Sequence, residues 1–454
     1  MEPHKPKRRW KSQAADVSAP LDLGGYANSD PAGHCPEKGG KPLVQSNPWS
    51  VCVIGGGPSG LGCCRRLCDA GMQVTLVQES RGLGGKLCTK FVNGKDDPSL
   101  HFDMGVQLLR PAGPLADLLN EGGESIVQPW PLPGRFKRIS CMQRDWNKPC
   151  RITSSADVPV DGLVVGVPSM SSIGRFLADK CWNLETHIDR TAHVIGRSPK
   201  THRWGVEWSR AEANAGQLRY RPELAQGATE AVSRSFDAVV LAFEANKILQ
   251  GCKSGYKQVA PSVTPALRKQ LSGRTKTSQL WNLMIAFDRE LPMPWDAAVV
   301  QGHSSLAWIA VNSSKPERAR VPQCFMVFST QSWATWKQWS KKEVERVLLY
   351  DFMCFLEQVL GFWPPQPSFV LSGRWGNNTE AVLTGVRPSG EFPVRALGYE
   401  STAEAGPEPL WDGEVCMGAT GDWARGFSVS DAYSAGVDLA DAMLKESFGR
   451  LPGG

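Results

Sequence analysis

The chain has 454 residues, of which 41 % are hydrophobic and 21 % charged, a composition that excludes fibrous and wholly disordered proteins. Its length exceeds what one hydrophobic core usually serves, so we expect two folding units or one large unit with an inserted lobe. Of the net charge of +6, residues 1–11 supply +4 through five cations against Glu2, which leaves about +2. A nearly neutral body argues against nucleic acid as a partner.

The thirteen cysteines are scattered through apolar segments, and no CxxC pair is followed by a second one. This pattern predicts reduced, buried thiols rather than a disulfide framework or a zinc site. The seven histidines show no HExxH or paired spacing, so we expect no metal. No uncharged apolar run reaches the roughly 18 residues of a membrane span, and no secretory signal is visible. We expect an intracellular, cytoplasmic protein, with organelle import and the oligomeric state left open.

Residues 1–48 are rich in Pro, Gly, Asn, Asp and Lys and have no apolar period. The composition predicts a disordered basic leader, and a targeting or nuclear-import role is the alternative interpretation.

A βαβ unit is predicted from Trp49 onward: a buried strand, a glycine turn, a helix and a second strand over Val74 to Val77. In the turn, Gly55, Gly57 and Gly60 occupy the three places of the dinucleotide fingerprint. They allow a tight turn, close approach of a pyrophosphate and packing of helix on strand. Pro58 and Ser59 complete the turn, where the helix N-terminus would face the phosphates.

Glu79 and Ser80 follow the second strand, nineteen and twenty residues after Gly60. A carboxylate at this place can accept both ribose hydroxyls and would repel a 2′-phosphate. Glycine-rich turns are common, so a purely structural turn is the alternative. The strand before it, the helix after it and the acidic residue together favour a dinucleotide site.

The remaining elements follow in chain order. The predicted elements are loops and short strands over 111–160, a short helix over 171–183, a hairpin around 193–208 with a polar excursion at 209–234, a returning strand at 238–242, strands within 279–330, an amphipathic helix over 341–360, and a strand, loop and closing helix over 415–445.

Directly after the acidic residue, ESRGLGGK places Gly84, Gly85 and Lys86 where a second close approach to a dinucleotide is expected. Together with HFDMGVQ, this segment resembles the flavin amine oxidoreductase superfamily, and its renalase-like branch in particular. The resemblance implies that the glycine pair and the cation lie along the FAD pyrophosphate and ribityl chain. The family usually has Arg where this chain has Lys86, which replaces a bidentate phosphate contact by a point charge.

The resemblance extends with gaps from about residue 50 to 445 and implies further cofactor residues. FDMGVQ would place Gly105 and Gln107 near the flavin. THIDRTAHVIG would place Val194 at the adenine. GDWARGFSVSDAYSAG would bring Gly421 and Asp422 to the FAD and aim the helix at Ser430 toward the flavin. Ordinary alternatives exist for two of these residues: Asp422 as a loop carboxylate and Lys86 as a surface lysine.

Substrate residues are implied by LAWIAVNSSKPER, the most branch-specific segment, with Trp308, Asn312 and Lys315 as candidates. Core, turn and surface positions are the alternative for these three. Trp375 is a further candidate, although SGRWGNNTEAV departs from the family's usual R-W-R-Y.

The sequence thus predicts an α/β fold: a three-layer Rossmann-type FAD-binding domain with an inserted mixed α+β substrate lobe. The expected boundaries are 49–112, 163–250 and 372–447 for the FAD-binding domain, and 113–162 and 251–371 for the substrate domain.

The implied function is an oxidase that binds FAD non-covalently, takes a hydride from a small organic donor and passes electrons to dioxygen, giving hydrogen peroxide. NAD(P)H or an isomer of it is the favoured donor. Alternatives are a flavin amine oxidase, a polyene desaturase, and a non-catalytic module that binds FAD or a nucleotide.

Overall fold

The computed structural model describes residues 49–93, 99–142, 149–210, 231–250, 263–272, 280–336, 338–375, 408–426 and 428–448. The leader expected over residues 1–48 and most of the polar excursion over 209–234 lie outside these residues. None of the helices in the described ranges is both long and apolar enough to cross a membrane. The cysteines in these ranges are free thiols, and most are buried.

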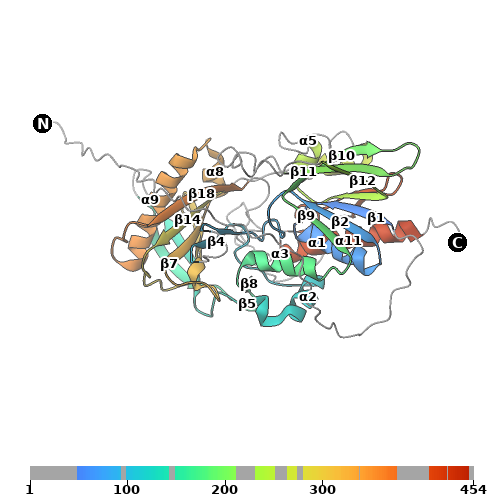
Figure 1. The fold of residues 1–454 in the computed structure, drawn as a ribbon. Helices are drawn as coiled ribbons and strands as arrows, with labels where there is room; N and C mark the ends of the chain where they lie inside the picture. The colour runs from blue at the N-terminus through green and yellow to red at the C-terminus, as the bar shows by residue number, and fades with distance from the viewer. Residues whose placement is uncertain are drawn as a thin grey trace, which may run out of the picture. The chain divides into compact units, whose positions relative to one another are not determined.

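A six-stranded sheet carries the predicted βαβ unit (Figure 1). In spatial order its strands are β19 (Leu410–Asp412), β20 (Met417–Ala419), β13 (Ala238–Leu241), β1 (Ser50–Ile54), β2 (Gln73–Gln78) and β9 (Leu184–Ile188). All neighbours are parallel except β19 and β20. The run Val51–Ile54 is buried on both faces, as expected for a central parallel strand.

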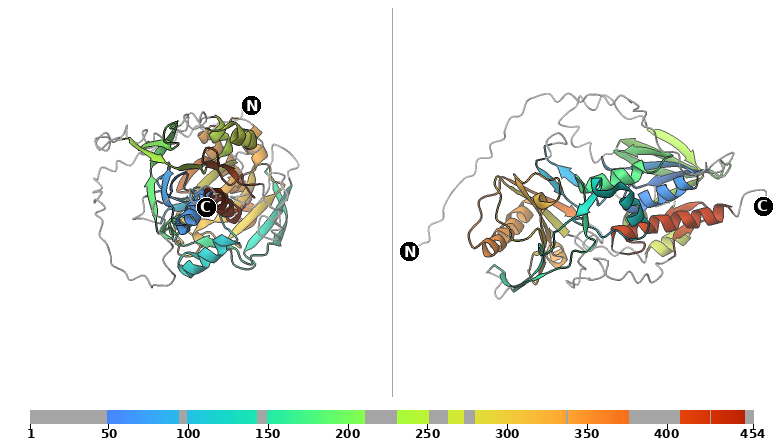
Figure 2. Two further views of the ribbon diagram at one scale, coloured as in Figure 1. Left: turned by 90° about the vertical axis from the view of Figure 1, so that its right-hand side faces the viewer. Right: turned by 90° about the horizontal axis from the view of Figure 1, so that it is seen from below.

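Helix α1 (Pro58–Asp69) connects β1 to β2, and α11 (Val429–Phe448) packs along it (Figure 2). Glycines allow this close contact, because a Cβ at Gly436 would lie 1.8 Å from the Ser59 carbonyl oxygen and one at Gly62 would lie 2.3 Å from the Tyr433 carbonyl oxygen. The buried residues of α1 include Cys63 as well as Leu61, Cys64, Leu67 and Cys68. Helix α1 is therefore covered on two sides.

A seven-stranded, mostly antiparallel sheet is the second large sheet of the described structure. Its order is β18 (Phe369–Trp375), β14 (Leu280–Phe287), β17 (Gln323–Ser329), β16 (Leu306–Val311), β15 (Ala297–Gln301), β6 (Phe136–Met142) and β7 (Arg151–Asp157). The predicted amphipathic helix is α9 (Lys341–Leu360), which covers this sheet with Val344, Leu348 and Phe352. Ser340 and Glu343 form a capping box at its start.

Smaller elements connect and cover the two large sheets. A third sheet holds β10 (Arg190–Arg197), β11 (Trp204–Arg210) and β12 (Val232–Phe236), and two pairs are formed by β3 (Thr89–Phe91) with β4 (His101–Asp103) and by β5 (Val127–Pro129) with β8 (Val164–Gly166). The helices are α2 (Pro114–Gly122), α3 (Met170–Asp179), α5 (Ala245–Gln250), α7 (Pro265–Ser272) and α8 (Gln331–Trp336), with short 3-10 turns η1 (Gly123–Ser125) and η4 (Asn312–Ser314).

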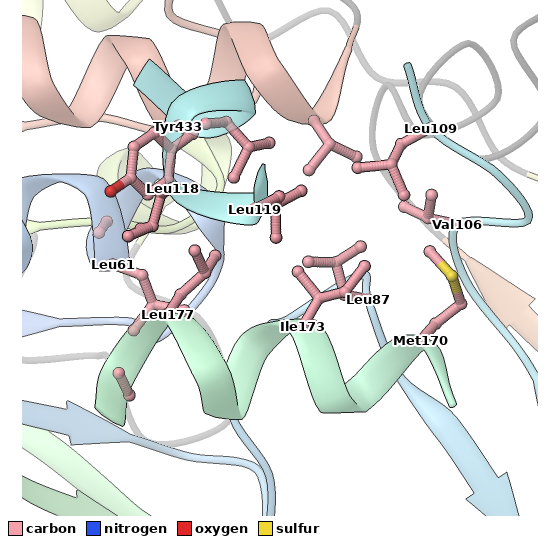
Figure 3. Close-up of a cluster of buried hydrophobic side chains, with 14 of the residues drawn as sticks. Leu61, Leu87, Val106, Leu109, Leu118, Leu119, Met170, Ile173, Leu177 and Tyr433 are labelled. Atoms are coloured by element: carbon pink, nitrogen blue, oxygen red, sulfur yellow. The ribbon is translucent and has the colours of Figure 1, made fainter. Parts of the chain in front are cut away.

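One hydrophobic cluster runs from the six-stranded sheet to the seven-stranded one, because it contains Val51 and Leu61 as well as Met284 and Trp308. Figure 3 shows the part between α3 and α2, where Leu87 lies beside Ile173 and Val106 lies near Leu109. The segments that carry Lys86 and Gly105 are thus anchored by apolar neighbours in sequence.

Candidate dinucleotide site

The candidate site lies at the carboxyl edge of the six-stranded sheet. Strand β1 has parallel partners on both sides, β2 and β13, which are reached by connections in opposite directions. At such a switch point the loops after neighbouring strands diverge and leave a crevice for a ligand. Gly55, Glu79, Ala242 and Thr420 are the first residues after the four central strands.

The three fingerprint glycines have different structural reasons. Gly55 has φ +112°, and a Cβ there would lie 2.3 Å from the Ala242 carbonyl oxygen. A Cβ at Gly60 would lie 1.9 Å from the Gly55 carbonyl oxygen, so this glycine lets α1 pack on β1. A Cβ at Gly57 would meet no atom of the described residues within 4 Å. Of the three, Gly57 is the glycine that nothing in the protein's packing requires.

The N-terminus of α1 is open to an anion. Gly57 is the N-cap, no side chain caps the helix, and no acidic residue lies in its first turn. Pro58 at the first position has no N–H, and helix geometry leaves the amides of Ser59 and Gly60 without an intrahelical acceptor. Together with the helix dipole, these amides form a site that attracts phosphate.

The end of β2 contains a residue that the sequence analysis missed. The Gly56 amide donates to Gln78 Oε1 at 2.5 Å, and Gln78 Nε2 donates to Ser80 Oγ at 2.5 Å. Ser80 Oγ in turn donates to the Gly82 carbonyl. Gln78 therefore holds the glycine corner against the turn that follows β2, and half-buried Glu79 comes directly after it. The sequence could have indicated Gln78 by its position, because it is the last residue of the second strand and directly precedes the acidic Glu79.

The second glycine pair lies against the first. Gly84 and Gly85 have φ of +100° and +54°, and the Gly84 amide donates to the Gly56 carbonyl at 2.7 Å. A Cβ at Gly85 would lie 3.0 Å from Gly57 Cα. The backbone of ESRGLGGK is thus brought to the corner where the open face of Gly57 lies.

Lys86 and Asp422, which are 336 positions apart, form an ion pair. Both side chains are largely but not fully buried, with 15 % and 17 % exposure. Lys86 is therefore not a solvated surface lysine, and Asp422 is not an isolated loop carboxylate. The structure joins two predicted cofactor residues at the edge of the sheet.

The predicted flavin segment packs on the same loop. A Cβ at Gly105 would lie 1.9 Å from the Lys86 carbonyl oxygen, which accepts from the Val106 amide at 2.8 Å. Gln107 is fully buried, and its Nε2 donates to the carbonyls of Asp103 and Gly105. The Gln107 side chain thus braces its own turn.

A buried ionic cluster lies behind this turn, and sequence reasoning missed two of its members, Asp103 and Arg318. Asp103 Oδ2 accepts from Lys315 Nζ at 2.9 Å and from Arg318 at 3.1 Å, and all three side chains are fully buried. Thr89 Oγ1 donates to the other carboxylate oxygen at 2.6 Å. The sequence offered little signal for this cluster, because Asp103 lies in the short run HFDM and both basic residues lie in the polar run SSKPER, which reads as a surface turn.

The protonation states follow from this arrangement. Burial alone would raise the pKa of Asp103, but Arg318, Lys315 and the Thr89 hydroxyl hold it well below its usual range. Burial and the neighbouring Arg318 lower the pKa of Lys315 to about 8, against the opposing attraction of Asp103. At pH 7 the cluster therefore holds one anion and two cations.

The substrate candidates are placed in the core or at the junction of the sheets. Trp308 is fully buried against Phe136, so its core interpretation holds. Asn312 donates to the His101 carbonyl at 3.0 Å. Trp375, on β18 of the seven-stranded sheet, donates to the Met104 carbonyl at 2.8 Å. Asn312, Lys315 and Trp375 thus all reach the segment from His101 to Gln107.

Three further candidates lie at other points. Val194 is buried and pairs with Val206 beside a β-bulge in the third sheet. Gly421 lies under the indole of Trp423, since a Cβ there would be 2.2 Å from Trp423 Nε1. Ser430 Oγ donates to the Arg110 carbonyl and accepts from the Ala112 amide, so it fixes the loop between them.

The edge fits a dinucleotide on its own geometry. It combines the open face of Gly57, an uncapped helix start and the buried Thr420 hydroxyl, which has no hydrogen-bond partner among the described residues. Within the same ranges, no group of three or more His, Cys, Asp or Glu side chains could hold a metal.

Comparison with a protein-family model agrees with this geometry. Residues 53–121 match the model described as the NAD(P)-binding Rossmann-like domain. The matched range contains the fingerprint glycines, Glu79, the second glycine pair and the Gly105 turn.

Solved structures share the fold over most of the chain. An oxidoreductase from Methanosarcina mazei has a TM-score of 0.50 and 12 % identity, covering 87 % of this chain and 100 % of its own. Putrescine oxidase bound to putrescine has a TM-score of 0.54 and 11 % identity over 88 % and 99 %. Cyclohexylamine oxidase from Brevibacterium oxydans IH-35A has a TM-score of 0.54 and 14 % identity, covering 88 % of this chain and 100 % of its own.

At such identities the likeness establishes the fold. The predicted fold class, α/β with a Rossmann-type domain and a mixed α+β lobe, is confirmed. The exact domain boundaries stay a prediction.

Proposed function

We propose that this chain, which has the fold of the oxidases named above, is an oxidoreductase that binds FAD non-covalently at the carboxyl edge of the six-stranded sheet. The observation that supports the proposal most directly is the open space beside Gly57 among the described residues. The open face of Gly57, the bare first turn of α1 and the adjoining Gly84–Gly85 backbone form one polar corner that the protein's own side chains do not fill.

Two features bear on which dinucleotide binds. First, the acidic Glu79 at the end of β2 suits the two ribose hydroxyls of FAD or NAD and disfavours the 2′-phosphate of NADP. Second, the Gly84–Gly85 backbone and the Lys86–Asp422 pair extend the polar surface beyond the first phosphate corner. A longer ligand, with a ribityl chain and a large ring after the pyrophosphate, would use that extension.

The proposed roles of the chain's residues follow from their places. The amides of Ser59 and Gly60 would bind the pyrophosphate, and Glu79 would accept from the ribose. Lys86 would supply a positive charge for phosphate, with Asp422 orienting its ammonium group and accepting from ribityl hydroxyls. The Gly105 turn would lie beside the flavin ring and keep water from one side of it.

When bound, FAD would supply the redox chemistry: it would take up one hydride, which carries two electrons, from a small organic donor, and the two electrons would pass with two protons to dioxygen and give hydrogen peroxide. The favoured donor is NAD(P)H or an isomer of it, because the segment LAWIAVNSSKPER resembles the renalase-like branch most specifically. An amine is the second candidate, because two proteins with this fold are putrescine oxidase and cyclohexylamine oxidase.

The absorbance spectrum of the purified protein tests the proposal. We expect a flavin spectrum, or stoichiometric uptake of added FAD, with the flavin released on denaturation because it is not covalently bound. Anaerobic mixing with NADH, NADPH, their isomers and primary amines should bleach it with one donor class, and air should restore the colour with formation of peroxide.

Each outcome separates the alternatives. Bleaching by dihydronicotinamides alone supports the favoured donor, and bleaching by amines alone supports the second. A flavin that no donor reduces indicates a binding module without turnover. A protein that cannot take up FAD contradicts the proposal.

A further inference from the structure

Side chains from the seven-stranded sheet and from the η4 turn that follows β16 hold the segment from His101 to Gln107, because they donate hydrogen bonds to its main-chain carbonyls. Asn312 donates to the His101 carbonyl, and Asn282 and Trp375 donate to the Met104 carbonyl at 3.2 and 2.8 Å. These three hydrogen bonds fix the position of the turn relative to the seven-stranded sheet.

The same turn is in contact with the proposed cofactor corner. Gly105 packs directly on the Lys86 carbonyl, Lys86 follows Gly85, and Gly85 lies against Gly57. A dinucleotide whose pyrophosphate rests at Gly57 and which continues along Gly85 and Lys86 therefore reaches the Met104–Gln107 turn next.

Directly behind that turn lies the buried charge cluster. Lys315, which follows the η4 turn, donates to Asp103 at 2.9 Å and to Gln107 Oε1 at 3.4 Å, and its ammonium lies 4.9 Å from the centre of the Trp130 ring. Arg318 also donates to Asp103 and to the Gly166 carbonyl.

The cluster has an unbalanced charge. One carboxylate faces two cations, and Glu317, the other acidic side chain that acts on Arg318, is exposed to solvent. The Nε and Nη1 groups of Arg318 have no hydrogen-bond partner among the described residues. A buried excess positive charge is costly for stability alone, since a neutral pair would suffice to fill this space. The excess calls for a functional reason.

We propose that Asp103, Lys315 and Arg318 form a positioning cluster that fixes the Met104–Gln107 turn and places one net positive charge behind it, where it stabilises the negative charge of reduced flavin. This inference rests on the proposed function. Fixed charges in a water-poor site act more strongly than charges in water, so a single buried unit charge can shift a redox equilibrium.

Charge counting gives the test. Lys315→Met removes one cation and leaves a neutral Asp103–Arg318 pair. The double variant D103N/K315M removes more contacts but restores one net positive charge. Each FAD-loaded protein is equilibrated with a reference dye at pH 7, and the ratio of oxidised to reduced flavin is read from the spectrum at a fixed dye potential.

We expect the ratio to rise about tenfold in K315M and to return to within about threefold of wild type in the double variant, because the net charge is restored. A purely structural cluster predicts the opposite order, with the double variant at least as perturbed as the single one. That order, or an unchanged ratio in K315M, overturns the inference.

If K315M does not accumulate as folded protein, Arg318→Met and D103N/R318M carry the same charge count with Lys315 in place. Loading with FAD is measured first for every variant. Failure of the wild type to take up FAD contradicts the proposed function, whereas loaded variants with unchanged redox ratios contradict only the role of the cluster.

Discussion

Three glycines of one motif serve separate purposes. Gly55 and Gly60 are required by the fold, since any Cβ at either would overlap a main-chain oxygen. Gly57 has φ −76° and ψ 176°, values that any residue adopts, and it faces open space. The proposed ligand would account for a glycine at this position, so Gly57 is where fold and function can be tested apart.

Gly57→Ala should leave the free energy of unfolding of the FAD-free protein within about 1 kcal/mol of wild type, because the new methyl group meets no protein atom. It should weaken FAD binding by about ten- to a hundredfold, or roughly 1.4–3 kcal/mol, by occupying the phosphate position. Urea denaturation and FAD titration measure the two effects.

The matched control is Gly82→Ala, since a Cβ at Gly82 also meets nothing within 4 Å and the residue lies in the turn after β2. It should change neither quantity. Equal FAD affinities for both variants would show that Gly57 does not face the ligand.

His303 makes hydrogen bonds that require its imidazole ring to be neutral. Its Nδ1 accepts from the Ser305 and Leu306 amides, both at 3.2 Å, in the turn between β15 and β16. Burial lowers the pKa of His303 to about 4, against an ordinary value of 6.5. The unfolded chain takes up a proton below about pH 6.5 that the folded protein refuses until about pH 4.

Stability should therefore fall as the pH decreases from 6.5 to 4, with a contribution from His303 on the order of 2–3 kcal/mol. His303→Asn keeps an acceptor for the same amides but does not titrate in this range. Urea denaturation of both proteins at pH 7.5 and 4.5 isolates the difference. An equal loss in both would show that His303 does not cause it.

At the scale of elements, the contact between α1 and α11 couples the phosphate corner to the C-terminal helix. Gly436 lies where a Cβ would be 1.8 Å from the Ser59 carbonyl oxygen and 2.8 Å from the Cys63 amide. Ser59 belongs to the first turn of α1, whose amides face the proposed pyrophosphate. A shift of α11 must displace that turn.

Gly436→Ala should destabilise the protein by about 1–3 kcal/mol through overpacking and should also weaken FAD binding, although residue 436 does not face the ligand. Ser434→Ala is the control on the same helix, because it adds no heavy atom. Thermal denaturation and FAD titration check both. Destabilisation with unchanged FAD affinity would show that the first turn of α1 accommodates the shift.

At the scale of the whole molecule, one hydrophobic cluster joins both large sheets. Because Val51 of β1 and Trp308 of β16 belong to the same cluster, neither sheet can unfold without exposing the core of the other. Cooperative unfolding follows from such sharing.

Far-UV circular dichroism and tryptophan fluorescence should therefore report coincident urea transitions, with the buried Trp130, Trp208 and Trp308 as probes. Two separated transitions would show that the lobes are independent folding units.

Ligand binding should stabilise the whole protein by linkage. FAD at a hundred times its dissociation constant should raise the free energy of unfolding by about 2.7 kcal/mol. At the same concentration NADP⁺ should stabilise less, because Glu79 would repel its 2′-phosphate. Stronger stabilisation by NADP⁺ than by FAD would reverse the assignment of the resident cofactor.

Local signals in the sequence were enough to predict the glycine corner, where we propose that phosphate binds. A buried strand, glycines at fixed spacing and an acidic residue after the next strand are all encoded within thirty-odd neighbouring residues, and the structure brings Gly55, Gly57, Gly60, Gly84 and Gly85 together there. Hydrophobic patterning likewise predicted α9 and the strands β14, β16 and β17 of the seven-stranded sheet.

The charge cluster and the Lys86–Asp422 pair were decided by tertiary structure. Asp103 meets Lys315 and Arg318 across more than 200 positions, and Lys86 meets Asp422 across 336. No local pattern shows which strand of one sheet lies beside which turn of another, and a buried lysine looks the same in sequence as a solvated one. Burial and pairing arise only when distant segments pack, so the sequence by itself determined the corner that would bind phosphate, and packing alone decided the charges placed behind it.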